Sequence, residues 1–281
     1  MMWLFLACTD ADGRSPIPKD ERPPLDADTD TDTDTDSDAD TDADTDADTD
    51  ADTDADTDAD TDADTVDPPL GGTSGGSGGA DAPRGADLTV GSTTYGLLAP
   101  TGSARGAAVP LLVVISGTEG GDLMLANMAQ VAPYYGLDDA LIAVLDGTTA
   151  RAADAAAVLD DVRAQFDVDN DRTWLLSESA GTRAGLELAF EERPTYFAAY
   201  WANDVNDRAT PAVDAAALGF TPWGNAGPGG DLPDAEAIVD GMRSAGWNLP
   251  SDAPYSGSGS GTHGSTDQFL AAVDFFADKE R

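Results

Sequence analysis

Apolar runs alternate with helical spacings along the C-terminal two thirds of the chain. Residues 110–116 and 141–146 are continuous apolar runs, typical of strands that are buried on both faces. Apolar residues at helical spacing follow at 123–135 and 152–166. The same patterns predict a hairpin-like strand pair at 88–100, strands at 173–177, 197–202 and 218–223, and helices after Ser179, at 234–245 and at 266–277. Strands that alternate with helices predict an α/β fold with a doubly wound, mostly parallel sheet.

The chain ahead of this pattern has a different composition. Aspartate occupies every even position from 26 to 64, and Ala, Thr or one Ser fills the odd positions. Such a tract has no apolar side chain to bury and its charges repel one another, so it cannot fold alone. Pro, Gly, Ser and Ala dominate 67–86. We therefore interpret 9–86 as a long disordered, Asp-rich linker and 87–281 as one folded domain.

The aspartate tract also invites comparison with calcium loops, which use Asp at alternate positions. Those loops need a turn glycine and a closing bidentate Glu, and the tract at 26–64 has neither. Only weak, nonspecific cation binding is expected there, and no shaped metal site.

Residues 1–8 resemble the end of a bacterial lipoprotein signal, in which a short apolar run closes on a small residue before a lipidated cysteine. The run is very short and no basic segment precedes it, as if the start codon had been placed too far downstream. Cys8 is the only cysteine of the chain, so no disulfide can form within it. The sequence predicts lipidation of Cys8, and a protein that is extracellular or at the cell surface, anchored by that lipid to a bacterial membrane.

Charge narrows the choice of partners. The formal net charge is −40, of which the aspartate tract supplies half, and 87–281 alone carries about −18. This charge repels nucleic acid and anionic membranes, so no nucleic-acid partner and no membrane contact other than the lipid are expected. We expect a monomer.

The candidate chemistry begins at Ser179. The segment 173–181 is an apolar run, then Ser179 on a turn of small residues, then a helix-forming stretch. Such a turn exposes a nucleophilic Oγ and aims the next backbone N–H at a developing oxyanion. The usual pattern is Gly-x-Ser-x-Gly, and Ser177 replaces its first glycine. The only histidine, His263, lies downstream and is the candidate general base. The plainer interpretations are a surface serine at an ordinary strand–helix junction and a surface imidazole.

Three anchors carry a family resemblance: Leu-Leu-Val-Val-Ile-Ser-Gly-Thr-Glu-Gly-Gly (111–121), Asp-Arg-Thr-Trp-Leu-Leu-Ser-Glu-Ser-Ala-Gly (171–181) and Gly-Thr-His-Gly (261–264). With them, 88–281 resembles the α/β-hydrolase superfamily, most closely the secreted esterases of the polyhydroxybutyrate depolymerase and feruloyl esterase type. The first loop of that family usually begins His-Gly, where this chain has Ser116-Gly117. The resemblance implies a serine carboxylesterase that forms an acyl-enzyme from a small-molecule or polymer ester, without cofactor or metal.

The resemblance also implies a triad acid in the loop after the next-to-last strand. Asp231, in a glycine-rich loop ahead of a helix, is the first choice. Asp234 is a rival that is equally suited to cap that helix. Asp204 and Asp207, which follow the preceding strand, complete the set of candidate acids.

The oxyanion hole is expected to combine the backbone N–H groups of Thr118 and Ala180. We expect Asp122 to cap a helix that starts at Leu123, and Glu119 to face solvent, because inward carboxylates would oppose an oxyanion. These acids and the two departures at Ser116 and Ser177 keep a second interpretation open. It is a catalytically inactive α/β-hydrolase-like surface lipoprotein with a binding or structural role.

Overall fold

The computed structural model describes residues 67–83 and 85–281. The signal-like segment 1–8 with Cys8, the aspartate tract 26–64 and most of the predicted linker lie outside the described residues.

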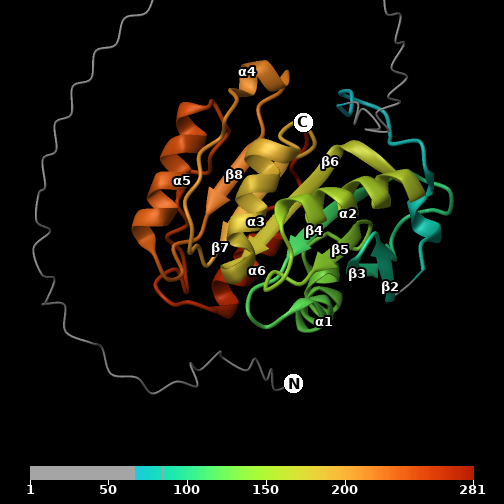
Figure 1. Ribbon diagram of the computed structural model, residues 1–281, viewed down its shortest axis with the longest axis horizontal. Helices are drawn as coiled ribbons and strands as arrows, with labels where there is room; N and C mark the ends of the chain where they lie inside the picture. The colour runs from blue at the N-terminus through green and yellow to red at the C-terminus, as the bar shows by residue number, and fades with distance from the viewer. Residues whose placement is uncertain (1–66, 84) are drawn as a thin grey trace, which may run out of the picture. The chain divides into compact units, whose positions relative to one another are not determined.

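A mostly parallel sheet forms the centre of the folded part (Figure 1). Its strand order is β2-β3-β5-β4-β6-β7-β8, and β4 to β8 all pair in parallel, while β3 is antiparallel to both of its neighbours. The strands are β2 (Ala86–Val90), β3 (Thr93–Leu98), β4 (Val109–Ile115), β5 (Leu141–Leu145), β6 (Phe166–Glu178), β7 (Ala199–Asn203) and β8 (Trp223–Ala226). This architecture confirms the predicted α/β class.

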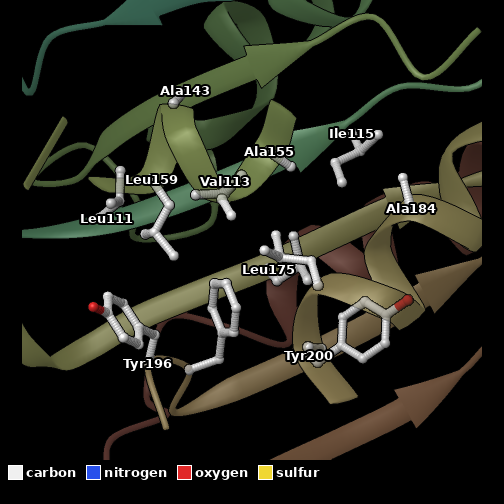
Figure 2. Packing of buried hydrophobic residues seen from close by; sticks show 14 of the residues in the cluster. Leu111, Val113, Ile115, Ala143, Ala155, Leu159, Leu175, Ala184, Tyr196 and Tyr200 are labelled. Carbon is white, nitrogen blue, oxygen red and sulfur yellow. The ribbon is translucent and has the colours of Figure 1, made fainter. Parts of the chain in front are cut away.

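Helices cover both faces of the sheet, as the alternation of side chains along β4 requires. Leu111, Val113 and Ile115 of β4 pack toward α2 (Ala152–Gln165), α3 (Thr182–Glu187) and α5 (Leu232–Ser244). Figure 2 shows this layer, with Ala155 and Leu159 of α2 and Ala184 of α3 beside the strand residues. Leu112 and Val114 pack on the opposite face toward α1 (Gly121–Val131) and α6 (Thr266–Asp274). Within the described residues, no helix has the length and apolar character that crossing a membrane requires.

The last strand lies later in the chain than the prediction of 218–223. Ala215–Leu218 forms a short helix, α4, and Gly219, at a φ of 82°, ends it in the left-handed conformation that glycine adopts readily. β8 therefore begins only at Trp223.

The folded part also begins before residue 87, which corrects the predicted end of the linker. Ser77–Gly78 (β1) pairs in parallel with the start of β6, and η1 (Gly79–Asp81) follows. The two segments approach so closely that a Cβ on Gly76 would lie 2.5 Å from the carbonyl oxygen of Phe166. This pairing explains why β6 starts at Phe166 and is longer than the predicted 173–177.

Candidate active site

The carboxyl ends of the parallel strands bring the candidate residues to one edge of the sheet, where ligands bind in such folds. The loop 116–120 follows β4, Asp146 follows β5, Ser179 follows β6 and Asp204 follows β7. His263 comes from the loop that precedes α6. Residues separated by up to 147 positions in sequence, from Ser116 to His263, are thus collected around one turn.

Ser179 stands on a strained turn between β6 and α3. Its φ is 45°, a region that costs a non-glycine residue roughly 1–3 kcal/mol, and Ser179–Gly181 forms a single 3₁₀ turn. Gly181 fits there because a Cβ on it would lie 2.6 Å from the carbonyl oxygen of Ser116. The predicted strand–turn–helix setting of the serine is therefore present.

Ser179 and His263 meet. Ser179 Oγ and His263 Nε2 are 2.9 Å apart, within hydrogen-bond distance. Ser179 is 7% exposed, whereas His263 is exposed on its Gly/Ser-rich loop. The structure brings together the two residues that the sequence selected as nucleophile and base.

Among the candidate acids, Asp204 lies beside the histidine loop. Its Oδ2 accepts a 2.5 Å hydrogen bond from the N–H of Gly264, and its Oδ1 accepts one of 2.8 Å from Gln268 Nε2. Asp204 is 1% exposed and has a φ of 47°. Burial raises the pKa of Asp204, while the Gly264 N–H, the charge of His263 and the Gln268 amide lower it.

The remaining candidate acids have different partners. Asp231, the first choice from the sequence, is the N-cap of α5 and accepts from the N–H of Asp234. Asp234 is paired with Arg208. Asp207 lies 3.9 Å from Arg183 and accepts from the N–H of Arg208. The geometry therefore favours Asp204 over Asp231. The glycine-rich loop that contains Asp231 packs closely against Asp204, since a Cβ on Gly229 would lie 1.6 Å from Asp204 Oδ1.

Ser116 holds the loop after β4, at the position where this chain has Ser116-Gly117 in place of His-Gly. It is fully buried, and its Oγ accepts a 3.1 Å hydrogen bond from the N–H of Gly147 in the neighbouring loop. The next residue, Gly117, lies against the nucleophile, since a Cβ on it would be 3.2 Å from Ser179 Cβ. Thr118 follows in this loop and Ala180 follows Ser179, so the two predicted oxyanion donors belong to segments that flank Ser179.

Glu119 and Asp122 differ from expectation. Glu119 does not face solvent: it is partly buried, and its Oε1 accepts a 2.8 Å hydrogen bond from the N–H of Gly117. Burial raises the pKa of Glu119, and the negative charge of Asp146 adds to the rise, while two backbone N–H groups and His263 oppose it. Asp122 is not a cap, because α1 starts at Gly121 with Gly120 as its N-cap. Compact glycines at 120 and 121 let the helix begin earlier than the periodicity predicts.

Glu178, immediately before the nucleophile, is a second acid in this region. Its Oε2 is buried and has no hydrogen-bond partner among the described residues. Burial raises the pKa of Glu178 well above its ordinary value, and the charges of Glu119 and Asp204 raise it further. Glu119, Glu178 and Asp204 therefore influence one another around the serine and histidine.

Sequence reasoning missed Gln268. This fully buried residue of α6 donates to Asn203 Oδ1 at 3.0 Å as well as to Asp204 Oδ1. The only signal available was a glutamine on the apolar face of the last helix, one helical turn after the histidine loop.

Comparison with known proteins yields structural relatives only. No protein-family model and no curated protein matches the chain. It is similar to a thermostable esterase (16% identity, TM-score 0.48, 67% of this chain and 59% of that chain). It is also similar to the ferulic acid esterase AmCE1/Fae1A of Anaeromyces mucronatus (10%, 0.46, 66% and 84%) and to the carboxylesterase EstE1 from a metagenomic library (15%, 0.47, 66% and 83%). The chain thus spans 59% of the length of the first of these esterases. The order of its own strands, with the serine turn after β6, gives this chain the α/β-hydrolase fold.

Proposed function

We propose that this protein is a serine hydrolase that cleaves carboxylic esters through an acyl-enzyme. The observation that carries the proposal is the 2.9 Å approach of Ser179 Oγ to His263 Nε2 on a strained turn at the carboxyl edge of the sheet. A serine hydroxyl is a poor nucleophile until a base accepts its proton, and this geometry supplies the base.

In the proposed reaction, Ser179 Oγ attacks the acyl carbonyl as its proton passes to His263 Nε2. The tetrahedral intermediate collapses, and the imidazolium returns that proton to the departing alcohol, which leaves an ester on Ser179. Water, deprotonated by the same imidazole, then attacks this ester, and the imidazolium returns the proton to Ser179 Oγ as the carboxylic acid leaves. Asp204 is the proposed acid of the triad, because its carboxylate contacts the backbone next to His263 and its charge favours the imidazolium.

The N–H groups of Ala180 and Thr118 are the proposed oxyanion donors. Ala180 directly follows the nucleophile, and Thr118 follows Gly117 in the loop that lies against Ser179. Donors of this kind stabilise the charge that develops on the carbonyl oxygen.

The test is labelling of the full-length chain with a fluorophosphonate probe, together with turnover of p-nitrophenyl esters. Ser179→Ala and His263→Ala should each abolish labelling. Asp204→Asn should lower kcat by about 10²-fold or more, by the loss that such acids cause in known triads. Asp231→Asn removes an equal charge from the cap of α5 and should leave kcat within about threefold of the wild type.

A wild-type chain that is folded but neither labelled nor active would favour the inactive, binding or structural role instead. If Asp231→Asn were the damaging variant, Asp204 would lose its proposed place in the triad.

We also propose that the enzyme is located at a bacterial cell surface. A lipid on Cys8 would anchor the enzyme at a bacterial cell surface, with the aspartate tract as spacer. Mass spectrometry of the membrane fraction, with Cys8→Ser released into the medium as the expected contrast, tests it.

A further inference from the structure

Glu119 is placed where it must influence any substrate of Ser179. Its Oε1 holds the N–H of Gly117 at 2.8 Å. A Cβ on Gly117 would lie 2.6 Å from Glu119 Oε2 and 3.2 Å from Ser179 Cβ, so the carboxylate and the nucleophile border the same small space. His263 is among the groups whose charge acts on Glu119.

A hollow of about 410 Å³ opens beside this carboxylate. Glu119, Asp122, Asp146 and Asp87 contribute carboxylates to its lining, and Tyr95 and Leu125 contribute apolar surface. None of its lining residues is a lysine or arginine. Oδ1 of Asp146 accepts hydrogen bonds from the N–H and the hydroxyl of Thr148.

Glu178, the residue before the nucleophile, is a further acid whose charge is coupled to that of Glu119, and the side chain of Asn203 lowers the pKa of Glu178. Its Oε2 is a buried carboxylate oxygen that accepts no hydrogen bond from any described residue. Of the charges that act on it, that of Glu119 is the largest, followed by that of Asp204, and both are negative. The raised pKa means that a proton compensates Glu178 itself, so the uncompensated negative charge of this region is that of Glu119 and the hollow.

Negative charge here also conflicts with the chemistry of ester cleavage. An oxyanion that forms beside Glu119 is repelled by it, and a low local dielectric strengthens that repulsion. A cation brought by the substrate would remove the conflict by pairing with Glu119 in both the ground state and the transition state.

We propose that the site is specific for esters that carry an organic cation, an ammonium group, which occupies the acidic hollow and pairs with Glu119. The proposal rests on the proposed serine hydrolase function. Glu119 is its specificity-determining residue, and Asp122 contributes less because it borders only the hollow.

The test compares charged and neutral esters of the same shape. Acetylcholine is matched with 3,3-dimethylbutyl acetate, and the p-nitrophenyl ester of betaine with p-nitrophenyl 3,3-dimethylbutanoate. For each pair we compare kcat/KM of the charged ester with kcat/KM of the neutral ester. In the pair whose cation reaches the hollow, this ratio should fall by about tenfold or more in Glu119→Gln. The glutamine keeps an acceptor for the N–H of Gly117. Asp122→Asn should lower the ratio less, and Glu191→Gln, the same change on the exposed surface of another helix, should leave it unchanged.

A second measurement does not depend on turnover. Calorimetric titration with choline and with 3,3-dimethylbutan-1-ol should show tighter binding of choline to the wild type, with the difference lost in Glu119→Gln. Equal ratios in wild type and Glu119→Gln for both ester pairs, with choline bound equally by both proteins, would overturn the proposal. If no ester is cleaved, the hydrolase function fails by itself, and the choline titration alone decides whether the cation site exists.

Discussion

Ser177 and Gly185 face each other behind the nucleophile, so closely that a Cβ on Gly185 would lie 2.4 Å from Ser177 Cβ. The pattern Gly-x-Ser-x-Gly puts a glycine on the strand so that the helix can pass. Here the strand carries the serine and α3 carries the glycine. Ser177 Oγ also forms a 2.8 Å hydrogen bond with Tyr200 Oη, which gives its side chain a partner in the core.

Substitutions at Ser177 and Gly185 should have non-additive effects on the free energy of unfolding. Gly185→Ala should lower the free energy of unfolding by about 1–3 kcal/mol, because neither buried side can give way, although alanine is the better helix former. Adding Ser177→Gly should recover part of that loss, since it removes the opposing Cβ. Urea unfolding of the two single variants and the double variant measures the coupling. Additive effects would mean that the two residues do not limit each other.

Gln268→Met should change the pH dependence of the proposed enzyme. The glutamine donates to the Asp204 carboxylate and so favours its charged form; without it, the pKa of Asp204 rises. Because the proposed triad needs ionised Asp204, the acidic limb of kcat/KM should move to higher pH. The matched control is Gln130→Met on the exposed side of α1. If Gln268→Met lowers stability but leaves the acidic limb of kcat/KM where it was, Gln268 only packs in the core.

Glu178→Gln should make the free energy of unfolding less dependent on pH. In the wild type the folded-state pKa of Glu178 is raised well above 4.5, so the folded state binds more protons than the unfolded state between those two values. Stability therefore falls as pH rises through that window, by up to about 1.4 kcal/mol per pH unit. The glutamine variant has no such proton to lose. Denaturant titrations between about pH 5 and pH 8 compare the two slopes, and parallel slopes would contradict the assignment.

Removing 67–86 should destabilise the domain, although composition alone grouped this segment with the linker. Ser74 N–H donates to Val168 O at 2.8 Å, Gly71 N–H to Asp171, and Arg281 to the carbonyl oxygens of Pro68 and Pro69. At about 1 kcal/mol per hydrogen bond, a chain that begins at residue 87 should lose about 2–5 kcal/mol relative to one that begins at residue 66. Urea unfolding of the two chains tests this prediction. If both chains unfold with the same midpoint and slope, the folded domain starts at residue 87, as composition indicated.

Periodicity predicted the elements whose burial is uniform. The apolar run at 110–116 is β4, which is buried along its whole length, and 141–146 is β5. The sequence also selected Ser179 and His263, because the serine has a local turn signature and the chain has one histidine. The first signal is contained in a few neighbouring residues, and the second needs only a count along the chain.

Other features depend on contacts that no local pattern records. Asp204 follows β7 in an Asn-Asp-Val stretch that has no catalytic signature of its own, and only the fold brings it to Gly264 and Gln268. Glu119 was expected in solvent because its inward position is unfavourable by itself. The segment 67–83 looked like linker because its partners, the start of β6 and Arg281, are about 90 to 213 positions away.

The approach of His263 to Ser179 has a practical consequence, since the chain contains no other histidine. In a proton NMR spectrum the imidazole ring resonances come from one residue, and that residue is at the nucleophile. They can be followed in the full-length, unlabelled protein without assignment of the remaining spectrum. A single sample can thus report the protonation state of the base, the effect of removing the serine hydroxyl, and the arrival of a cation nearby.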